Sequence, residues 1–147
     1  MDYNGLVKSY EIDKDIYEIA KKNIIEYKKI YNVDFDIELV LSDAKTTLEK
    51  EEGIYDLIFI DAAKGHYQKF YNQIINNLKK GSIIISDNVL FKGMIATDEY
   101  VNKRKITIVK RMRKYIDFLM NDPFLTTTII PIGDGVAISY YNGGKNE

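Results

Sequence analysis

A carboxylate side chain follows each of the first four apolar runs of this sequence, and an amide joins it after the fourth. Glu11 follows the first run, Ser42-Asp43 the second, Asp61 the third and Asp87-Asn88 the fourth. If the runs are parallel strands, these side chains share the edge of the sheet where ligands bind in open α/β folds. Like charges gathered there repel one another unless a cation or a hydroxyl-rich ligand lies among them. The pattern therefore predicts a ligand site, although each residue alone is more typical of a turn or helix cap.

Asp61, Asp87 and Asn88 are the most informative of these residues, because they end two strands that would be neighbours. Two carboxylates and one amide oxygen suit a hard divalent cation such as Mg²⁺. Lys64 lies three residues beyond Asp61, so one turn of chain can bring its ammonium to the same place as a general base. Tyr67 follows Lys64 toward this place and joins the candidate site.

Three further polar residues have weaker signals. Glu11, an acidic residue at the end of a strand in a nucleotide-binding half, is suited to ribose hydroxyls, in dinucleotides and S-adenosylmethionine alike. His66 has no Ser or Cys nucleophile motif beside it, and we expect it to cap or line the start of a helix. Asp134 lies within Gly-Asp-Gly, where turn geometry alone accounts for it.

The elements that must hold these residues alternate between strand length and helix period. Unbroken apolar strands such as Leu57 to Ile60 indicate an α/β fold, with a mostly parallel sheet covered by helices on both faces. Asp13 and Asp15 suit the start of the first helix, and Gly81 suits the end of the third. The expected elements are strands Gly5–Tyr10, Asp36–Leu41, Tyr55–Ile60 and Ser82–Ser86, and helices Asp13–Ile30, a short one from Ala44, and His66–Lys80.

The C-terminal part has a different pattern. A loop from Phe91 to Tyr100 precedes a helix from Asn102 to about Met120, and strands follow around Leu125–Ile130 and Val136–Tyr140. Pro131-Ile132-Gly133-Asp134-Gly135 between these strands is typical of a hairpin turn. The sheet is therefore expected to end in an antiparallel pair.

Composition narrows the function classes. The chain has 147 residues, 46% hydrophobic and 29% charged, with a net charge of −1 and no Cys. This length suits one domain, and the absence of Cys excludes thiolate chemistry within these residues. No apolar run approaches a membrane span, and the first residues do not resemble a cleavable signal. We expect a cytoplasmic protein with no membrane partner.

The predicted helix from Asn102 is locally basic in a nearly neutral chain. Such a surface suits a phosphate backbone, although a solvated helix face is the more typical explanation. Against a single acidic residue, Asp117, it has seven cations: Lys103, Arg104, Lys105, Lys110, Arg111, Arg113 and Lys114.

From about Leu6 to Tyr140 the chain resembles the metal-dependent S-adenosylmethionine O-methyltransferases, the family of the catechol and caffeoyl-coenzyme A enzymes. Within the family, Asp87 to Gly93 and the basic helix look most similar to the bacterial tRNA 5-hydroxyuridine methyltransferases. The resemblance rests on four segments: Glu11-Ile12-Asp13, Phe59-Ile60-Asp61-Ala62-Ala63-Lys64, Ser86-Asp87-Asn88-Val89-Leu90 and Pro131-Ile132-Gly133-Asp134-Gly135.

The resemblance implies a Rossmann-like methyltransferase fold and a role for each candidate residue. It implies O-methylation of a metal-bound hydroxyl in 5-hydroxyuridine of tRNA or, alternatively, in a small catechol-like or acyl-coenzyme A acceptor. We also expect a homodimer at full length. The implied roles are metal ligation by Asp61, Asp87 and Asn88, proton removal by Lys64, and contact with S-adenosylmethionine by Glu11 (ribose), Asp43 and Ala44 (adenine), Asp61 and Tyr67.

The family has a first strand and a Gly-rich loop before the Glu11 strand, and only ten residues precede Glu11 here. A strand–helix–strand unit needs roughly 30 residues. We therefore expect residues 1–147 to be one N-terminally truncated domain, with a gap or free strand edges between the Glu11 and Asp61 strands. Two alternatives remain: a nicotinamide-dependent oxidoreductase, for which a Gly-rich fingerprint is missing, and an inactive remnant that pairs with another chain.

Overall fold

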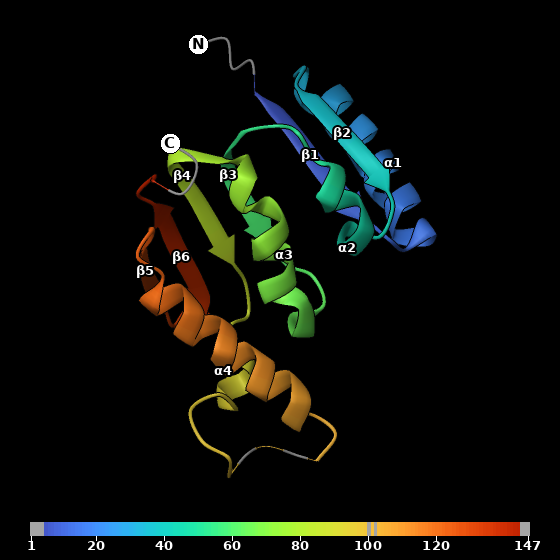
Figure 1. Ribbon diagram of the computed structural model, residues 1–147. Helices are drawn as coiled ribbons and strands as arrows, with labels where there is room; N and C mark the ends of the chain where they lie inside the picture. The colour runs from blue at the N-terminus through green and yellow to red at the C-terminus, as the bar shows by residue number, and fades with distance from the viewer. Residues whose placement is uncertain (1–4, 100, 102, 145–147) are drawn as a thin grey trace. The chain divides into compact units, whose positions relative to one another are not determined.

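The computed structural model describes residues 5–99, 101 and 103–144 (Figure 1). It divides the chain into two compact units, residues 1–50 and residues 51–147. No described helix combines the length and the apolar character that crossing a membrane would require. Each unit is described by itself.

The first unit is a two-stranded parallel sheet whose strands are connected by a long helix (Figure 1). Its elements are β1 (Leu6–Glu11), α1 (Lys14–Tyr31), β2 (Asp36–Leu41), α2 (Ala44–Thr47) and a 3₁₀ turn at Leu48–Lys50. Asp13 caps α1 by accepting bonds from the amides of Asp15 (2.9 Å) and Ile16 (3.1 Å). The predicted cap is therefore confirmed, and left-handed Asn32 ends the helix.

This first unit buries little of its apolar surface. No residue of α1 is buried, and more than half the surface of Ile16, Ile19 and Ile25 is exposed. Leu6 and Val7 of β1 are exposed as well. A two-stranded sheet with one open helix is of marginal stability by itself.

The second unit contains a mixed four-stranded sheet in the order β3-β4-β6-β5. The pair β3–β4 is parallel, and β6 runs antiparallel to both β4 and β5. The predicted α/β fold, with parallel strands and an antiparallel C-terminal pair, is therefore confirmed. Its elements are β3 (Tyr55–Ile60), α3 (Tyr67–Ile74), β4 (Leu78–Ser86), α4 (Ile106–Asn121), β5 (Leu125–Ile130), β6 (Val136–Tyr141), and 3₁₀ turns at Lys64–His66, Ile75–Asn77 and Phe91–Gly93.

Aromatic side chains form much of the core of this unit. Tyr67 and Tyr115 meet edge to face, with ring centroids 5.6 Å apart, and so join α3 to α4. Tyr71 packs against Phe118 of α4 in the same way at 4.8 Å. Ile84 of β4 is fully buried. This core fixes the ends of β3 and β4, which carry the candidate site.

The third predicted helix is too long and its predicted end is wrong. The α-helix stops at Ile74, and β4 begins at Leu78, twelve residues after His66. The buried amide of Asn77 donates to the carbonyls of Glu51 and Gly53, which fixes the chain before it enters the sheet. Gly81 does not end a helix: it lies within β4.

Gly81 has φ +96° at the place where the register between β3 and β4 shifts. Ser82 closes this irregularity, because its hydroxyl donates to the Tyr55 carbonyl at 2.7 Å and accepts from the Lys79 amide at 3.0 Å. Glycine signals a bulge in a strand as readily as a helix end, since both need a left-handed backbone.

Other boundaries differ less. The helix predicted from Asn102 begins at Ile106, and Tyr100 and Asn102 themselves lie outside the described residues. Among the described strands, β1 pairs only with β2 and β3 pairs only with β4. Each of these two strands therefore has one edge without a strand partner among the described residues, and the expected gap between them stays a prediction.

We expect Tyr71→Phe to lower the free energy of unfolding by about 1.5–3 kcal/mol, because a buried bond to a charged acceptor is lost. The Tyr71 hydroxyl donates to Asp122 Oδ2 at 2.9 Å inside the core. Urea unfolding measures the change. Tyr140→Phe, at a partly exposed position of β6, should stay within about 0.5 kcal/mol of the parent. Equal effects of the two substitutions would contradict this role.

Candidate functional site

Asp61 and Asp87 directly follow two paired strands. Ile60 ends β3 beside Ser86, the last residue of β4. The pairing extends one step further, because the Asp87 amide donates to the Ile60 carbonyl at 3.0 Å. This bond keeps the two strand ends together and brings Asp61 and Asp87 to the same edge of the sheet, as predicted.

The Asp87-Asn88 pair forms a tight polar turn. Asn88 has a left-handed backbone with φ 53°, a conformation that Asn tolerates better than most residues. Asp87 Oδ1 accepts from the Asn88 backbone amide at 2.6 Å and from Asn88 Nδ2 at 3.0 Å. The Asn88 amide group is thereby oriented, with its oxygen left to accept from another donor.

Lys64 is that donor. Its Nζ donates to Asn88 Oδ1 at 2.7 Å, across 24 residues of sequence. The same ammonium lies 5.9 Å from the centre of the Phe91 ring, within the range of a cation–π contact. The structure therefore brings Lys64 to the Asp87-Asn88 turn, as its spacing from Asp61 predicted.

Tyr67 supports this turn from inside the protein. Its hydroxyl donates to the backbone carbonyl of Asp87 at 2.9 Å, and its ring is buried against Tyr115. Burial raises the pKa of Tyr67 well above its usual value, and the nearby carboxylates of Asp61 and Asp87 raise it further. Tyr67 thus positions Asp87, whereas its contact with a cofactor stays a prediction.

Ser86 and Tyr115 form a second buried link beneath the site. Their hydroxyl oxygens lie 2.7 Å apart and share a hydrogen bond. This bond connects the last residue of β4 to the middle of α4. Sequence reasoning missed it, although a Ser at the end of the apolar run Ile83 to Ile85 was a signal that a buried hydroxyl needs a partner.

Glu11, Asp43 and Ala44 belong to the first unit and lie at one edge of its sheet. The Ser42 amide donates to the Glu11 carbonyl at 2.9 Å, so the ends of β1 and β2 meet. Glu11 Oε1 accepts from the Asp13 amide at 2.8 Å. Asp43 caps α2, in which Ala44 is the first residue, and pairs with Lys45. The predicted cofactor roles of these residues stay predictions.

The donor set of the second unit suits a hard divalent cation. Two carboxylates, Asp61 and Asp87, and the Asn88 amide supply only oxygen, which Mg²⁺ prefers. Across the described residues, no three His, Cys, Asp or Glu side chains gather as a metal site. A cation here would therefore need the Asn88 oxygen, to which Lys64 now donates, or oxygens from outside the protein.

Some cationic side chains of the basic helix already make contacts within the chain. Arg113 donates to the carbonyls of Met94 and Ile95 and to the Asp98 carboxylate at 2.7 Å, so it fastens the preceding loop. Arg111 contacts the Gly65 carbonyl at 3.4 Å. Lys110 and Lys114 are exposed. Only part of the predicted cationic surface is therefore left for an external phosphate.

His66 and Asp134 have the structural roles expected of them, and Asp134 has more. His66 lies at the start of α3, with its ring edge-on to Phe70. Asp134 accepts hydrogen bonds from the backbone amides of Leu90 and Lys92, which follow Asn88. Sequence reasoning attributed Asp134 to the turn alone and did not connect it with the site.

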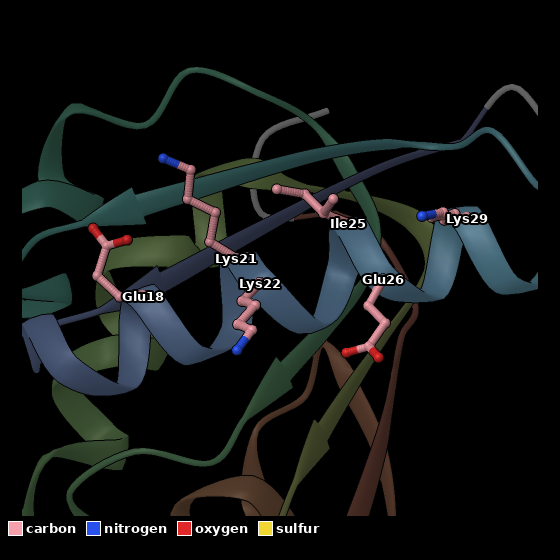
Figure 2. Close-up of a pocket in the computed structure, with 6 residues that line it drawn as sticks. All are labelled: Glu18, Lys21, Lys22, Ile25, Glu26 and Lys29. Carbon is pink, nitrogen blue, oxygen red and sulfur yellow. The ribbon is translucent and has the colours of Figure 1, made fainter.

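A surface hollow lies elsewhere, along α1 (Figure 2). All six of its labelled residues project from that one helix, and none is a predicted site residue: Glu18, Lys21, Lys22, Ile25, Glu26 and Lys29. Its mixed charges offer no arrangement for catalysis, so we do not place a site there.

Known proteins are similar to this chain over most of its length. Residues 1–141 match the model of the O-methyltransferase family. The chain belongs to this family. It is 29% identical to a caffeoyl-CoA O-methyltransferase of Medicago sativa, over 92% of this chain and 56% of that protein. The chain thus spans just over half the length of such a relative.

Two crystal structures extend the likeness to the fold. A Staphylococcus aureus protein, provisionally assigned as a caffeoyl-CoA O-methyltransferase, has a TM-score of 0.80 and 31% identity, covering 92% of this chain and 64% of its own. The methyltransferase PaMTH1 of Podospora anserina, bound to S-adenosylhomocysteine, has a TM-score of 0.72 and 26% identity, covering 95% and 61%.

We expect the stability of the chain to fall as the pH rises above about 10, because buried tyrosines keep protons that the unfolded chain releases. Burial raises the pKa of Tyr115 to about 12, against the smaller opposing effect of its bond to Ser86. Its stabilising contribution is therefore complete below pH 10 and is lost toward pH 12. Urea unfolding at pH 8, 10 and 11 should show a shallower decline in Tyr115→Phe. Parallel declines in both proteins would count against this assignment.

Proposed function

We propose that this chain forms part of an O-methyltransferase that uses S-adenosylmethionine and a divalent cation. The observation that carries the proposal is the meeting of Asp61, Lys64, Asp87 and Asn88 beyond β3 and β4, held by the Lys64–Asn88 bond. Membership in the O-methyltransferase family supports the reaction class. A nicotinamide oxidoreductase has no comparable support.

In this proposal Asp61, Asp87 and Asn88 hold the cation. A divalent cation in that position supplies Lewis acidity, which makes an acceptor hydroxyl easier to deprotonate. The oriented carboxylate of Asp87 is fixed by its bonds to Asn88 and by the Tyr67 contact at its carbonyl. Contacts within the protein thus orient Asp87 and Asn88, which supports their proposed role.

Lys64 accepts the proton of the acceptor hydroxyl at Nζ. Lys64 acts here as its neutral amine, after it has lost a proton to solvent, and the bond to Asn88 Oδ1 keeps that nitrogen in place. S-adenosylmethionine supplies a methyl group on a sulfonium, and the acceptor oxygen bonds to its carbon as the carbon–sulfur bond breaks. The protein's main contribution to such a transfer is alignment.

Glu11, Asp43 and Ala44 bind S-adenosylmethionine in this proposal. Glu11 accepts from the ribose hydroxyls, and Asp43 and Ala44 lie beside the adenine. The meeting of the β1 and β2 ends, through the Ser42–Glu11 bond, supports a shared role for Glu11 and Asp43. The structure of PaMTH1 with S-adenosylhomocysteine shows that a related protein binds the product of this cofactor.

We propose a small hydroxylated acceptor, catechol-like or linked to coenzyme A, because the Medicago sativa relative is named for caffeoyl-CoA. The 5-hydroxyuridine of tRNA stays a second candidate, favoured by the exposed cations Lys110 and Lys114 of α4. Arg113 is less suited to it, since the loop at Met94 to Asp98 already occupies its guanidinium. The homodimer also stays a prediction.

Asp87→Ala should lower metal-dependent methyl transfer by roughly 100-fold or more, because it removes a ligand and the acceptor of the Asn88 amide. The assay uses the longest protein that contains this chain, with labelled S-adenosylmethionine and Mg²⁺. Asp56→Ala removes a carboxylate from the start of β3 instead and should leave turnover unchanged. Undiminished activity in Asp87→Ala would refute the metal assignment.

Calorimetry with S-adenosylmethionine, with and without Mg²⁺, tests the cofactor separately. We expect binding in the same protein and a loss of roughly tenfold or more in Glu11→Ala, since ribose contacts are lost. Absence of binding in both conditions would favour an inactive remnant.

Methyl transfer to a catechol, an acyl-coenzyme A or total tRNA then identifies the acceptor, and transfer to tRNA alone would overturn our preference.

A further inference from the structure

We propose that Asp134 is a positioning residue for the Asp87-Asn88 pair and for Lys64. The inference rests on the function proposed above. The hairpin turn between β5 and β6 accepts three hydrogen bonds from backbone amides of the segment Asn88 to Lys92. Gly135 accepts from the Val89 amide and Asp134 from the Leu90 amide through their carbonyls, both at 2.9 Å. The Asp134 carboxylate accepts from the Lys92 amide.

We call these three bonds the tether and residues Asn88 to Lys92 the tethered segment. This segment would not keep its backbone conformation by itself. Asn88, Phe91 and Lys92 all have positive φ, at 53°, 45° and 56°. A left-handed backbone costs non-glycine residues about 1–2 kcal/mol each, and bulky Phe and Lys lack the local side-chain bonds that help Asn. Contacts outside the segment must therefore hold it, and the three bonds from the turn act there together with the burial of Val89 and Phe91.

The turn is shaped for this close approach. Gly135 has φ +81°, and a Cβ built on it would lie 2.2 Å from Leu90 Cγ. The Leu90 side chain occupies that space, so it packs directly on the backbone of the turn at Gly135. A hairpin turn by itself requires glycine for its φ angles but not a carboxylate aimed at a distant loop. The Asp of Gly-Asp-Gly thus has a purpose beyond the turn.

The tether affects the site through the two groups that contact Lys64. Its Nζ donates to Asn88 Oδ1 and lies over the ring of Phe91, and both partners belong to the tethered segment. Release of Lys92 would let Phe91 leave its left-handed conformation and withdraw its ring. The Lys64 ammonium and the Asn88 oxygen would then lose their fixed relation to Asp87.

Asp134→Ala tests the tether directly, with two matched controls. Asp134→Asn keeps an oxygen that can accept from the Lys92 amide and should preserve the site. Ile132→Ala alters an exposed side chain of the same turn and makes no contact change at the tethered segment. Amide hydrogen exchange and Mn²⁺ calorimetry are measured on all four proteins, with the β6 amides as the reference for global opening.

We expect Asp134→Ala to speed exchange at Leu90 and Lys92 roughly tenfold or more, while the β6 amides keep their parent rates. Mn²⁺ affinity should fall roughly 10–100-fold, as it does when residues that orient ligands are lost. Asp134→Asn and Ile132→Ala should stay within about threefold of the parent on both measures.

Two results would overturn the inference: parent-like exchange at Leu90 and Lys92 in Asp134→Ala, or an equal effect of Ile132→Ala. A parent protein that binds no Mn²⁺ would refute the metal part of the proposed function. The exchange rates would still decide the tether, so the two failures are distinguishable.

Discussion

The parallel pairing of β3 with β4 determines where the candidate residues of the second unit lie. It places Ile60 beside Ser86, and the bond from the Asp87 amide to the Ile60 carbonyl carries the alignment past the strands. Without that alignment, Asp61 and Asp87 would lie at different positions along the strand direction. The buried Tyr67 and Tyr115 then fix the strand end from below, through Asp87 and Ser86.

Much of this arrangement follows from patterns that act locally or through the sheet. The apolar runs ending at Ile60 and Ser86 predict neighbouring parallel strands, and parallel strands bring whatever follows them to one edge. Asp61, Asp87 and Asn88 are therefore predictable as a group. Lys64 is predictable because three residues limit how far its ammonium can lie from Asp61. In each case the sequence distance is short or the strand direction decides the outcome.

The missed features depend on contacts between segments that are distant in sequence. Gly81 suits a helix end and a strand bulge equally, and only the pairing of Leu78 with Tyr55 decides between them. Arg113 looks like one cation in a basic row, yet the loop before α4 takes up its guanidinium. Asp134 has a sufficient local explanation in its turn, so nothing in the sequence suggests its bonds to Leu90 and Lys92, more than forty residues away.

These distant contacts explain how a site can be built on an unfavourable backbone. Three left-handed residues in the segment Asn88 to Lys92 raise its free energy by an amount comparable to several net hydrogen bonds. The turn between β5 and β6 offsets that cost in the folded protein, because β6 is itself anchored by its ladder to β4. Asp87 follows β4, and the turn leads into β6, so the two strands next to the site are neighbours in one sheet. The sheet therefore holds in place the side chains that the proposed reaction needs. An isolated loop of the same sequence would not hold them in this way.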